Sequence, residues 1–193
     1  MSVVRYPLSG ALKLKRHLVL VGLPGAGKTT VGRLVAGALK APFVDLDDVI
    51  EAASGKGIAQ LFEERGEAAF RDLEREAMAR ALAAPPSVIA AGGGWAAQPG
   101  NLEAAGGRAV TVYLRAAPEV AARRVTGSQP RGPASDARPL LAGQDVERRM
   151  RELLEARRSS YERCQATVPA DGEQPAAVAG AVVKLARSLA GWY

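Results

Sequence analysis

Short runs of apolar residues alternate along the chain with longer segments in which apolar residues recur three and four positions apart. The apolar runs are HLVLVG, PFVDLD, SVIAAGGG, AVTVYL and a weaker one, ATVPA. Runs of this length are typical of buried strands, and the segments between them show the spacing of helices. Strands that alternate with helices predict an α/β fold in which helices cover both faces of a parallel sheet.

The helical segments fill most of the chain between the runs. They are KTTVGRLVAGALK, EAAFRDLEREAMARALAA, PEVAARRV, VERRMRELLEARRSSYERC and PAAVAGAVVKLARSLAG. Residues 126–137, TGSQPRGPASDA, lack this spacing, and their Gly, Pro and Ser content predicts a mobile loop. We expect residues 1–17 to be an N-terminal extension and residues 18–193 to form one domain.

Composition narrows the possible functions. Apolar residues make up 48% of the 193 residues and charged residues 24%, which is ordinary for a globular domain. The net charge of +6 comes from basic residues scattered along the chain, so it favours sites for small anions over nucleic acid. The apolar runs are too short to cross a bilayer, and we expect a cytoplasmic protein with no membrane partner.

Cysteine and histidine offer little chemistry in this sequence. Cys164 is the only cysteine, so it has no disulfide partner within the chain, and we expect a packed or partly exposed thiol rather than a nucleophile. His17 is the only histidine. It precedes the first strand, where we expect it to be exposed.

A phosphate-binding motif lies between the first apolar run and the first helical segment. Gly22, Gly27, Lys28 and Thr29 in GLPGAGKT fit the pattern G-x-x-x-x-G-K-[ST]. The glycines allow backbone N–H groups to surround a phosphate chain, and the helix N-terminus adds partial positive charge. Lys28 would reach the outer phosphates of ATP, and the Thr29 hydroxyl would bind Mg²⁺. The alternative is a tight turn with an incidental lysine, but it does not explain why the motif stands between a strand-like run and a helical segment.

Two carboxylates follow the second run, in FVDLDDVIE. In an extended strand, Asp45 and Asp47 would share one face beside the phosphate loop, where open α/β sheets bind ligands. Two carboxylates there suit a metal and a hydroxyl group. The alternative is a strand end followed by a helix cap, since aspartate commonly caps helices.

More motifs appear downstream in the order GIAQLFEERGEAAFRDLE, AAGGG, ARPLLAG and RRSSYE. Together with the phosphate loop they resemble the shikimate kinase family from residue 18 to residue 190. The resemblance implies a P-loop fold with a five-stranded parallel sheet, a mobile lid at residues 126–137 and a monomeric enzyme. It also implies transfer of the terminal phosphoryl group of ATP to the 3-hydroxyl of shikimate, a cyclic carboxylic acid, on the route to chorismate and the aromatic amino acids.

The resemblance also implies roles for individual residues. The catalytic residues would be Lys28, Asp47 and Arg138, and Thr29 and Asp45 would hold Mg²⁺. Asp47 would bind the acceptor hydroxyls, and two roles stay open for it. It could accept the proton of the reacting hydroxyl or only orient that group, because positioning does most of the work when the transition state is loose.

Two sets of binding residues follow from the resemblance. The residues expected to bind ATP are Gly25, Ala26, Gly27, Lys28, Thr29, Thr30, Arg124, Arg138 and Pro175. The residues expected to bind shikimate are Asp47, Phe62, Phe70, Arg71, Gly92, Gly93, Gly94, Arg138 and Arg157. Arg71 and Arg157 suit the substrate carboxylate, because guanidinium groups bind carboxylates with two parallel hydrogen bonds. Glu74 would orient Arg71. Three consecutive glycines indicate close approach of a ligand to the backbone.

Several details stay open at this stage. Either Arg123 or Arg124 could stack on the adenine ring. Phe62 and Phe70 could line the acceptor pocket or belong only to the core. Trp95 stands where a smaller residue is expected, and it could narrow the pocket or pack outside it. The loop at residues 126–137 is longer than in many similar enzymes, which could slow its closure.

Two other functions compete with this interpretation. One is a kinase for another small hydroxy acid, such as gluconate, or for a nucleotide, because the fold alone does not separate these substrates. The other is a small-molecule sensor within a transcription regulator. The segment before Leu18 is too short for a helix-turn-helix domain, which argues against the sensor.

Overall fold

The structure, a computed structural model, describes residues 14–127 and 145–193. One parallel sheet has the strand order β2-β3-β1-β4-β5. Its strands are β1 (His17–Val21), β2 (Phe43–Asp45), β3 (Val88–Ala90), β4 (Ala109–Arg115) and β5 (Ala166–Pro169). The predicted five-stranded parallel sheet is confirmed, including the weak fifth strand.

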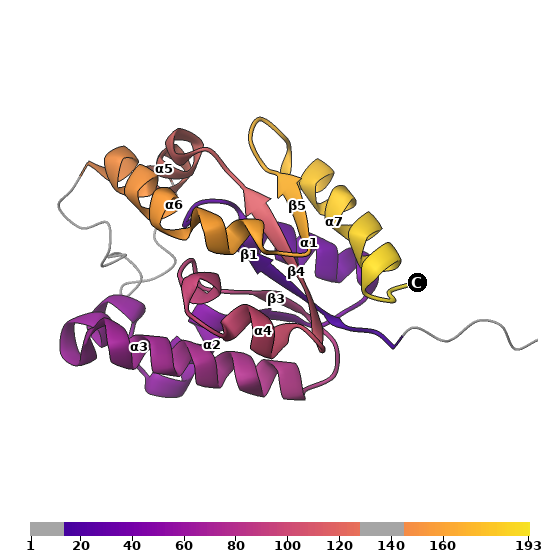
Figure 1. Ribbon diagram of the computed structural model, residues 1–193, viewed down its shortest axis with the longest axis horizontal. Coiled ribbons are helices and arrows are strands. Elements are labelled where there is room, and N and C mark those ends of the chain that lie inside the picture. The colour runs from indigo at the N-terminus through magenta and orange to yellow at the C-terminus, as the bar shows by residue number, and fades with distance from the viewer. Residues whose placement is uncertain (1–13, 128–144) are drawn as a thin grey trace, which may run out of the picture.

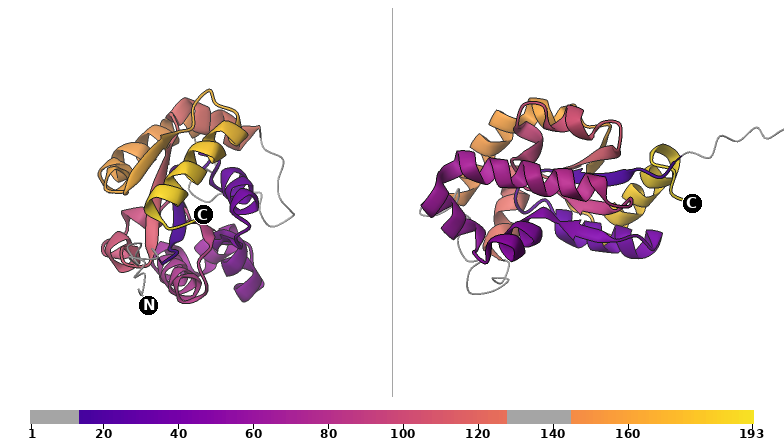
Figure 2. Two further views of the ribbon diagram at one scale, coloured as in Figure 1. Left: turned by 90° about the vertical axis from the view of Figure 1, so that its right-hand side faces the viewer. Right: turned by 90° about the horizontal axis from the view of Figure 1, so that it is seen from below.

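Helices lie on both sides of this sheet (Figures 1 and 2), so the predicted three-layer α/β/α fold is confirmed. Helices α1 and α7 pack against one another on one face, and α4 and α6 lie across the other. The helices are α1 (Lys28–Leu39), α2 (Leu46–Ser54), α3 (Ile58–Ala83), α4 (Asn101–Ala105), α5 (Pro118–Thr126), α6 (Val146–Glu162) and α7 (Pro175–Leu189), with a short 3₁₀ helix, η1 (Trp95–Ala97). None of the described helices is both long and apolar enough to cross a bilayer.

The central strands form the core of the protein. Every residue of β1 is buried, and β4 is buried up to Leu114. Leu18 of β1 pairs with Val88 of β3 on one side and with Val110 of β4 on the other. Burying a large apolar side chain contributes about 1.5–3 kcal/mol. This core therefore fixes the carboxyl end of β1, from which the phosphate loop begins.

The region after β2 differs from the expectation. The strand ends at Asp45 and α2 begins at Leu46, so Asp47 lies in the first helical turn and does not share a strand face with Asp45. The Asp45 side chain accepts a hydrogen bond from the Asp47 backbone N–H at 3.2 Å, which is the N-cap geometry of a helix. The expectation of a shared strand face is wrong, and the alternative, a strand end followed by a helix cap, is confirmed.

Helix α3 also begins earlier than the sequence pattern suggested. The pattern indicated a helix from Glu67, whereas α3 runs from Ile58 with a kink at Gly66. Gly66 has φ 76 and ψ 172, a backbone conformation that favours glycine and joins two helical pieces. The kink interrupts the apolar spacing, which is why the part of the helix before Gly66 escaped prediction.

His17 is buried, so the expectation of an exposed histidine is wrong. It is the first residue of β1 and is 3% exposed. Its Nδ1 accepts a hydrogen bond from the Ser87 backbone N–H at 3.2 Å and lies 3.1 Å from the Ser87 hydroxyl oxygen. Ser87 lies 70 residues away in the sequence, and its hydrogen bond to the ring nitrogen makes burial of this histidine possible. The strand also begins at residue 17, one residue before the expected domain boundary.

Two other expectations fall mostly outside the described part of the chain. The predicted N-terminal extension is described only from residue 14 onward. Only Thr126 and Gly127 of the predicted lid are described, and Thr126 is the last residue of α5.

We predict that His17 makes the folded state less stable in mild acid. Burial lowers the pKa of His17 below its ordinary value, and the positive charge of Arg108 acts in the same direction. The unfolded chain therefore binds this proton at a higher pH than the folded chain does. The free energy of unfolding should decrease as the pH falls through about 6.5 toward the lowered pKa of the folded state. Urea unfolding at about pH 7.5 and about pH 5.5 measures the change.

The matched variant for this prediction is His17→Asn. Asparagine has an acceptor oxygen near the position of Nδ1 and does not titrate, so the variant should lose less stability in acid than the native chain. If the free energy of unfolding of the two proteins depended equally on pH, His17 would not be the group responsible for the loss of stability.

Candidate active site

The phosphate loop connects β1 to α1 at the carboxyl end of the sheet. Gly25 has φ 80, and a β-carbon built on it would lie 2.3 Å from the Ala121 carbonyl oxygen, so only glycine fits. The Lys28 Nζ donates to the carbonyl oxygens of Gly22 and Leu23, each at 3.0 Å. The lysine ammonium group therefore lies over the loop, where outer phosphates would be bound in a P-loop.

A hydroxyl and a carboxylate meet beside the loop. The Thr29 hydroxyl donates to Asp45 Oδ2 at 2.7 Å, and Asp45 is 8% exposed. These oxygen atoms suit Mg²⁺, which prefers oxygen ligands and keeps several waters when it binds with a nucleotide. Nowhere in residues 14–127 or 145–193 do three or more His, Cys, Asp or Glu side chains gather into a metal-binding group. The Thr29 hydroxyl and the Asp45 carboxylate are the two oxygen ligands that this site could offer to Mg²⁺.

The glycine run after β3 lies against charged side chains from several elements. A β-carbon built on Gly92 would lie 2.0 Å from Glu74 Oε1 and 3.4 Å from Asp47 Oδ1. One built on Gly94 would lie 2.6 Å from Arg71 Nη1. These side chains occupy the space that a larger residue would need. Gly92 and Gly94 are therefore constrained to glycine as long as Glu74 and Arg71 keep these positions.

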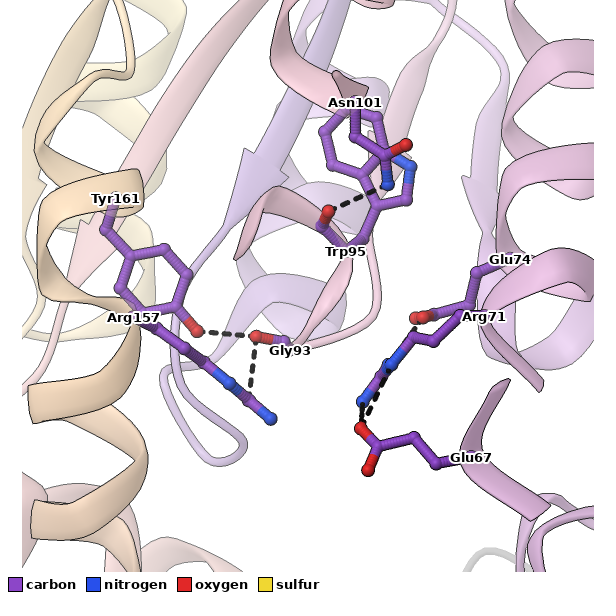
Figure 3. A network of polar contacts seen from close by, with 8 residues as sticks. All are labelled: Glu67, Arg71, Glu74, Gly93, Trp95, Asn101, Arg157 and Tyr161. Carbon is purple, nitrogen blue, oxygen red and sulfur yellow. Dashed lines mark hydrogen bonds and ion pairs between the residues drawn. The ribbon is translucent and has the colours of Figure 1, made fainter. Parts of the chain in front are cut away.

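Arg71 is 6% exposed. Figure 3 shows it between Glu67 and Glu74. Its Nη1 donates to Glu74 Oε2 at 2.5 Å, and its Nη2 donates to Glu67 Oε1 at 2.7 Å. Burial opposes the charged form of Arg71, but the two glutamates outweigh it and raise the pKa. The arginine therefore stays protonated.

Glu74 is 1% exposed, and burial raises the pKa of its carboxyl group despite the opposing charge of Arg71. Its Oε1 has no hydrogen-bond partner among the described residues. An unpaired buried oxygen is costly, and a hydroxyl group or a water molecule would satisfy it. This oxygen is the atom that lies against Gly92.

Arg157 and Tyr161 of α6 reach the same glycine run from the other side (Figure 3). The Gly93 carbonyl oxygen accepts from Arg157 Nη1 at 2.9 Å and from the Tyr161 hydroxyl at 2.5 Å. A β-carbon built on Gly93 would lie 3.1 Å from Pro24 Cδ of the phosphate loop. The phosphate loop, the glycine run and α6 therefore meet at Gly93.

The two phenylalanines lie beside Arg71. The rings of Phe62 and Phe70 have centroids 4.4 Å apart, and the Arg71 guanidinium carbon lies 5.8 Å and 5.6 Å from them. Phe70 is buried in the core, whereas Phe62 is half-buried. A cation–π interaction with the two rings favours one fixed orientation of the guanidinium group.

The expected adenine site is described in part. Arg124 Nη2 donates to the Ala170 carbonyl oxygen at 2.8 Å, so it lies beside the connection that leads to Pro175 at the start of α7. Arg123 and Arg124 both line a surface cavity of about 470 Å³. Arg138 lies outside the described residues.

Trp95 packs in the core and is 2% exposed. It begins η1, directly after the glycine run, and its carbonyl oxygen accepts from Asn101 Nδ2 at 2.9 Å. The indole ring belongs to the cluster of buried apolar side chains, which favours the interpretation that it packs away from ligands.

Two residues of this region were not identified from the sequence. Tyr161 lies four residues after Arg157, one helical turn away, and that spacing was a usable signal. Glu67 lies four residues before Arg71 and uses the same spacing. The pairing of Glu67 with Arg71 could have been inferred from this spacing, whereas the Gly93 carbonyl partner of Tyr161 could be found only with the fold in hand.

Comparison with known proteins decides the family. A family model described as shikimate kinase matches residues 24–187. The chain belongs to the shikimate kinase family.

Individual relatives agree with this assignment. A shikimate kinase of Caulobacter vibrioides is 43% identical over 164 residues, which are 85% of this chain and 78% of that protein. A shikimate kinase of Caldanaerobacter subterraneus is 37% identical over 176 residues, covering 91% of this chain and 99% of the relative. The structure of an Acinetobacter baumannii shikimate kinase in complex with shikimate matches with a TM-score of 0.82 and 32% identity, over 92% of this chain and 96% of that one. As a member of the shikimate kinase family, this protein is a phosphotransferase with an alcohol group as acceptor.

We predict that Gly92→Ala destabilises this shikimate kinase family member. The added methyl group would overlap with Glu74 Oε1 and push the carboxylate away from Arg71. Overpacking of this kind costs about 1–3 kcal/mol, and each kcal/mol lowers the melting temperature by roughly 2–4 °C in a domain of this size. Differential scanning calorimetry measures the shift.

Gly37→Ala is the matched control, because a β-carbon at this exposed position of α1 meets nothing within 4 Å. It should leave the melting temperature unchanged or raise it, since alanine favours helices over glycine. A Gly92→Ala variant as stable as the native chain would contradict the packing described here.

Proposed function

We propose that this protein phosphorylates the 3-hydroxyl of shikimate with ATP, and that the residues around the glycine run bind shikimate. The observation that carries the proposal is the meeting of Arg71, Arg157, Asp47 and Glu74 around Gly92–Gly94, directly beside the phosphate loop. Two cations suit a carboxylate and the acidic side chains suit hydroxyl groups. This combination fits a small hydroxy acid better than a nucleoside monophosphate.

The donor half of the site would hold ATP. Backbone N–H groups from Gly25 to Thr30 would surround its phosphates, and Lys28 would exchange its carbonyl partners for the outer phosphates. Arg124 and Pro175 would lie on the adenine ring, and the bond from Arg124 to the β5–α7 connection supports Arg124 over Arg123. A guanidinium group and a proline ring can both stack on a base.

Thr29 and Asp45 would hold Mg²⁺ together with the nucleotide, Asp45 partly through water. When bound, Mg²⁺ neutralises charge on the phosphates during transfer. The hydrogen bond between Thr29 and Asp45 orients both oxygen atoms in advance. The Asp45 bond to the Asp47 N–H ties this pair to the first turn of α2, which carries the acceptor-binding carboxylate.

The acceptor half would bind the carboxylate of shikimate between Arg71 and Arg157. Glu67 Oε1 now accepts from both Nε and Nη2 of Arg71, at 3.3 Å and 2.7 Å. This edge of the guanidinium group is the one that binds carboxylates with two hydrogen bonds. Since the Glu67 side chain is 56% exposed, a substrate carboxylate would replace it at low cost.

Asp47 would bind the reacting hydroxyl and hold it toward the terminal phosphate. Its Oδ1 lies on the same side of Gly92 as the unpaired Oε1 of Glu74, so two carboxyl groups face one small space. An acceptor hydroxyl bound there would satisfy the Glu74 oxygen. The position of Asp47 supports either role, proton acceptor or orienting group.

The activity itself is tested with a coupled assay that offers shikimate, gluconate and nucleoside monophosphates in turn. We expect ADP release with shikimate and little with the others. Lys28→Ala should reduce this release to background, whereas Lys184→Ala, at an exposed position of α7, should not change it. Turnover of nucleoside monophosphates alone, or ligand binding without ADP release, would overturn the proposal.

Asp47→Asn tests the role of the acceptor carboxylate. Asparagine can still orient a hydroxyl group but accepts its proton poorly, so we expect kcat to fall by about 10²-fold or more if Asp47 is a base. The KM for ATP should stay near its native value.

Asp48→Asn is the matched control, because Asp48 is a neighbouring exposed carboxylate that pairs with Arg33 at 3.7 Å. It should have native kinetics. Native turnover in Asp47→Asn would show that the Asp47 carboxylate has no role in the reaction.

A further inference from the structure

The segment from Gly92 to Ala97 is held at two carbonyl groups, those of Gly93 and Trp95, by side chains from two helices (Figure 3). The Gly93 carbonyl oxygen accepts from α6, and the Trp95 carbonyl oxygen accepts from Asn101 of α4. Hydrogen bonds within the segment, from Trp95 N to Gly92 O and from Ala97 N to Gly94 O, are each 3.1 Å long. Glycine residues have the greatest backbone freedom, so an ordered conformation of this segment depends on such contacts.

Tyr161 is well placed to provide the strongest of them. The residue is 0% exposed, and its ring stacks on Tyr113 of β4 with centroids 4.9 Å apart and planes 23° apart. Its hydroxyl donates to Gly93 O at 2.5 Å. Burial raises the pKa of Tyr161 to about 12, so the hydroxyl keeps its proton and remains a donor throughout the physiological range.

The direction of this bond determines where the next amide group points. The Gly93–Gly94 peptide bond is trans, so its C=O and N–H groups point in opposite directions. With the carbonyl oxygen bound by α6, the Gly94 N–H points away from α6. Arg71 lies against Gly94, on the side of the run opposite to Tyr161 in Figure 3. The amide therefore faces the side of the run on which Arg71 lies.

The same carbonyl oxygen also orients Arg157. Arg157 Nη1 shares Gly93 O with the Tyr161 hydroxyl, and Arg157 is 8% exposed. A carbonyl that is already fixed by a buried tyrosine gives the guanidinium group a fixed partner. The remaining N–H groups of Arg157 are then directed by the position of that carbonyl.

We propose that Tyr161 is a positioning residue for the acceptor. Through Gly93 O, it fixes both the Gly94 amide and the Arg157 guanidinium group for shikimate without touching the substrate. The inference rests on the proposed function, because it names what the positioned groups bind. It accounts for a buried hydroxyl that the phosphoryl transfer itself does not use.

Tyr161→Phe is the decisive variant, since it removes one hydroxyl group and keeps the ring stack. The loss of a hydrogen bond of this kind should raise the KM for shikimate roughly 5- to 10-fold, with the KM for ATP nearly unchanged. Tyr113→Phe removes a hydroxyl from the other ring of the same stack and does not alter the Gly93 contact. It should have native values of both KM constants.

Several outcomes would overturn the inference. Tyr161→Phe would melt at a lower temperature but keep a native KM for shikimate if the hydroxyl were only structural. An equal rise in both KM constants, or an equal effect of Tyr113→Phe, would also contradict a specific role. If the native chain does not phosphorylate shikimate, the proposed function fails; if it does and Tyr161→Phe matches it, only the role of Tyr161 fails.

A measurement on the native chain is independent of the folding of the variant. In protein labelled with ¹⁵N-glycine, the Gly94 amide resonance should shift when shikimate is added. An unchanged Gly94 resonance at saturating shikimate would contradict the inference.

Discussion

Three residues without a β-carbon, Gly92, Gly93 and Gly94, let charged side chains lie directly against the backbone at the carboxyl end of the central sheet. Glu74 and Arg71 of α3 occupy the space where side chains of Gly92 and Gly94 would be, and Arg157 of α6 binds the carbonyl oxygen between them. Without this close approach the two helices would be held further apart. The proposed acceptor site therefore depends on a local property of the chain after β3.

The cost of burying these charges is offset within the site. Arg71 and Glu74 are both nearly inaccessible to water, and an unpaired buried charge would destabilise the fold strongly. Their 2.5 Å contact and the second glutamate on Arg71 provide the compensation. One carboxylate oxygen, Glu74 Oε1, is left without a partner among the described residues. The protein thus keeps cations ordered before a substrate arrives, which lowers the entropy lost on binding.

The proposed donor and acceptor halves are connected through short polar contacts. Asp45 accepts from Thr29 at the start of α1 and from the backbone of Asp47 at the start of α2. Pro24 of the phosphate loop lies against Gly93. A displacement of one half would therefore be transmitted to the other. This arrangement suits an in-line transfer, in which small errors of position are costly.

The sequence was informative where a feature depends on neighbouring residues. The five strands, the phosphate loop and most helices follow from local spacing, because strand and helix periods are visible within a short window. For Asp45 and Asp47 the sequence left an extended strand and a helix cap as alternatives, and the structure has the cap, so Asp47 lies in the first turn of α2. The expectation that His17 is exposed was wrong for a different reason, because its hydrogen-bond partner Ser87 is 70 residues away. Tyr161 was missed because its partner, the Gly93 backbone carbonyl, lies 68 residues away in a different motif, and sequence spacing does not show which motifs meet. The assignments of individual ligand-binding residues stay predictions.

The most direct test of the central claim is a crystal structure of the protein with ADP, Mg²⁺ and shikimate. The account predicts the carboxylate of the acid between Arg71 and Arg157, with Glu67 displaced from Arg71, and its hydroxyl groups over Gly92–Gly94 beside Asp47. A complex in which the acid binds elsewhere, while Glu67 keeps its bonds to Arg71, would contradict it.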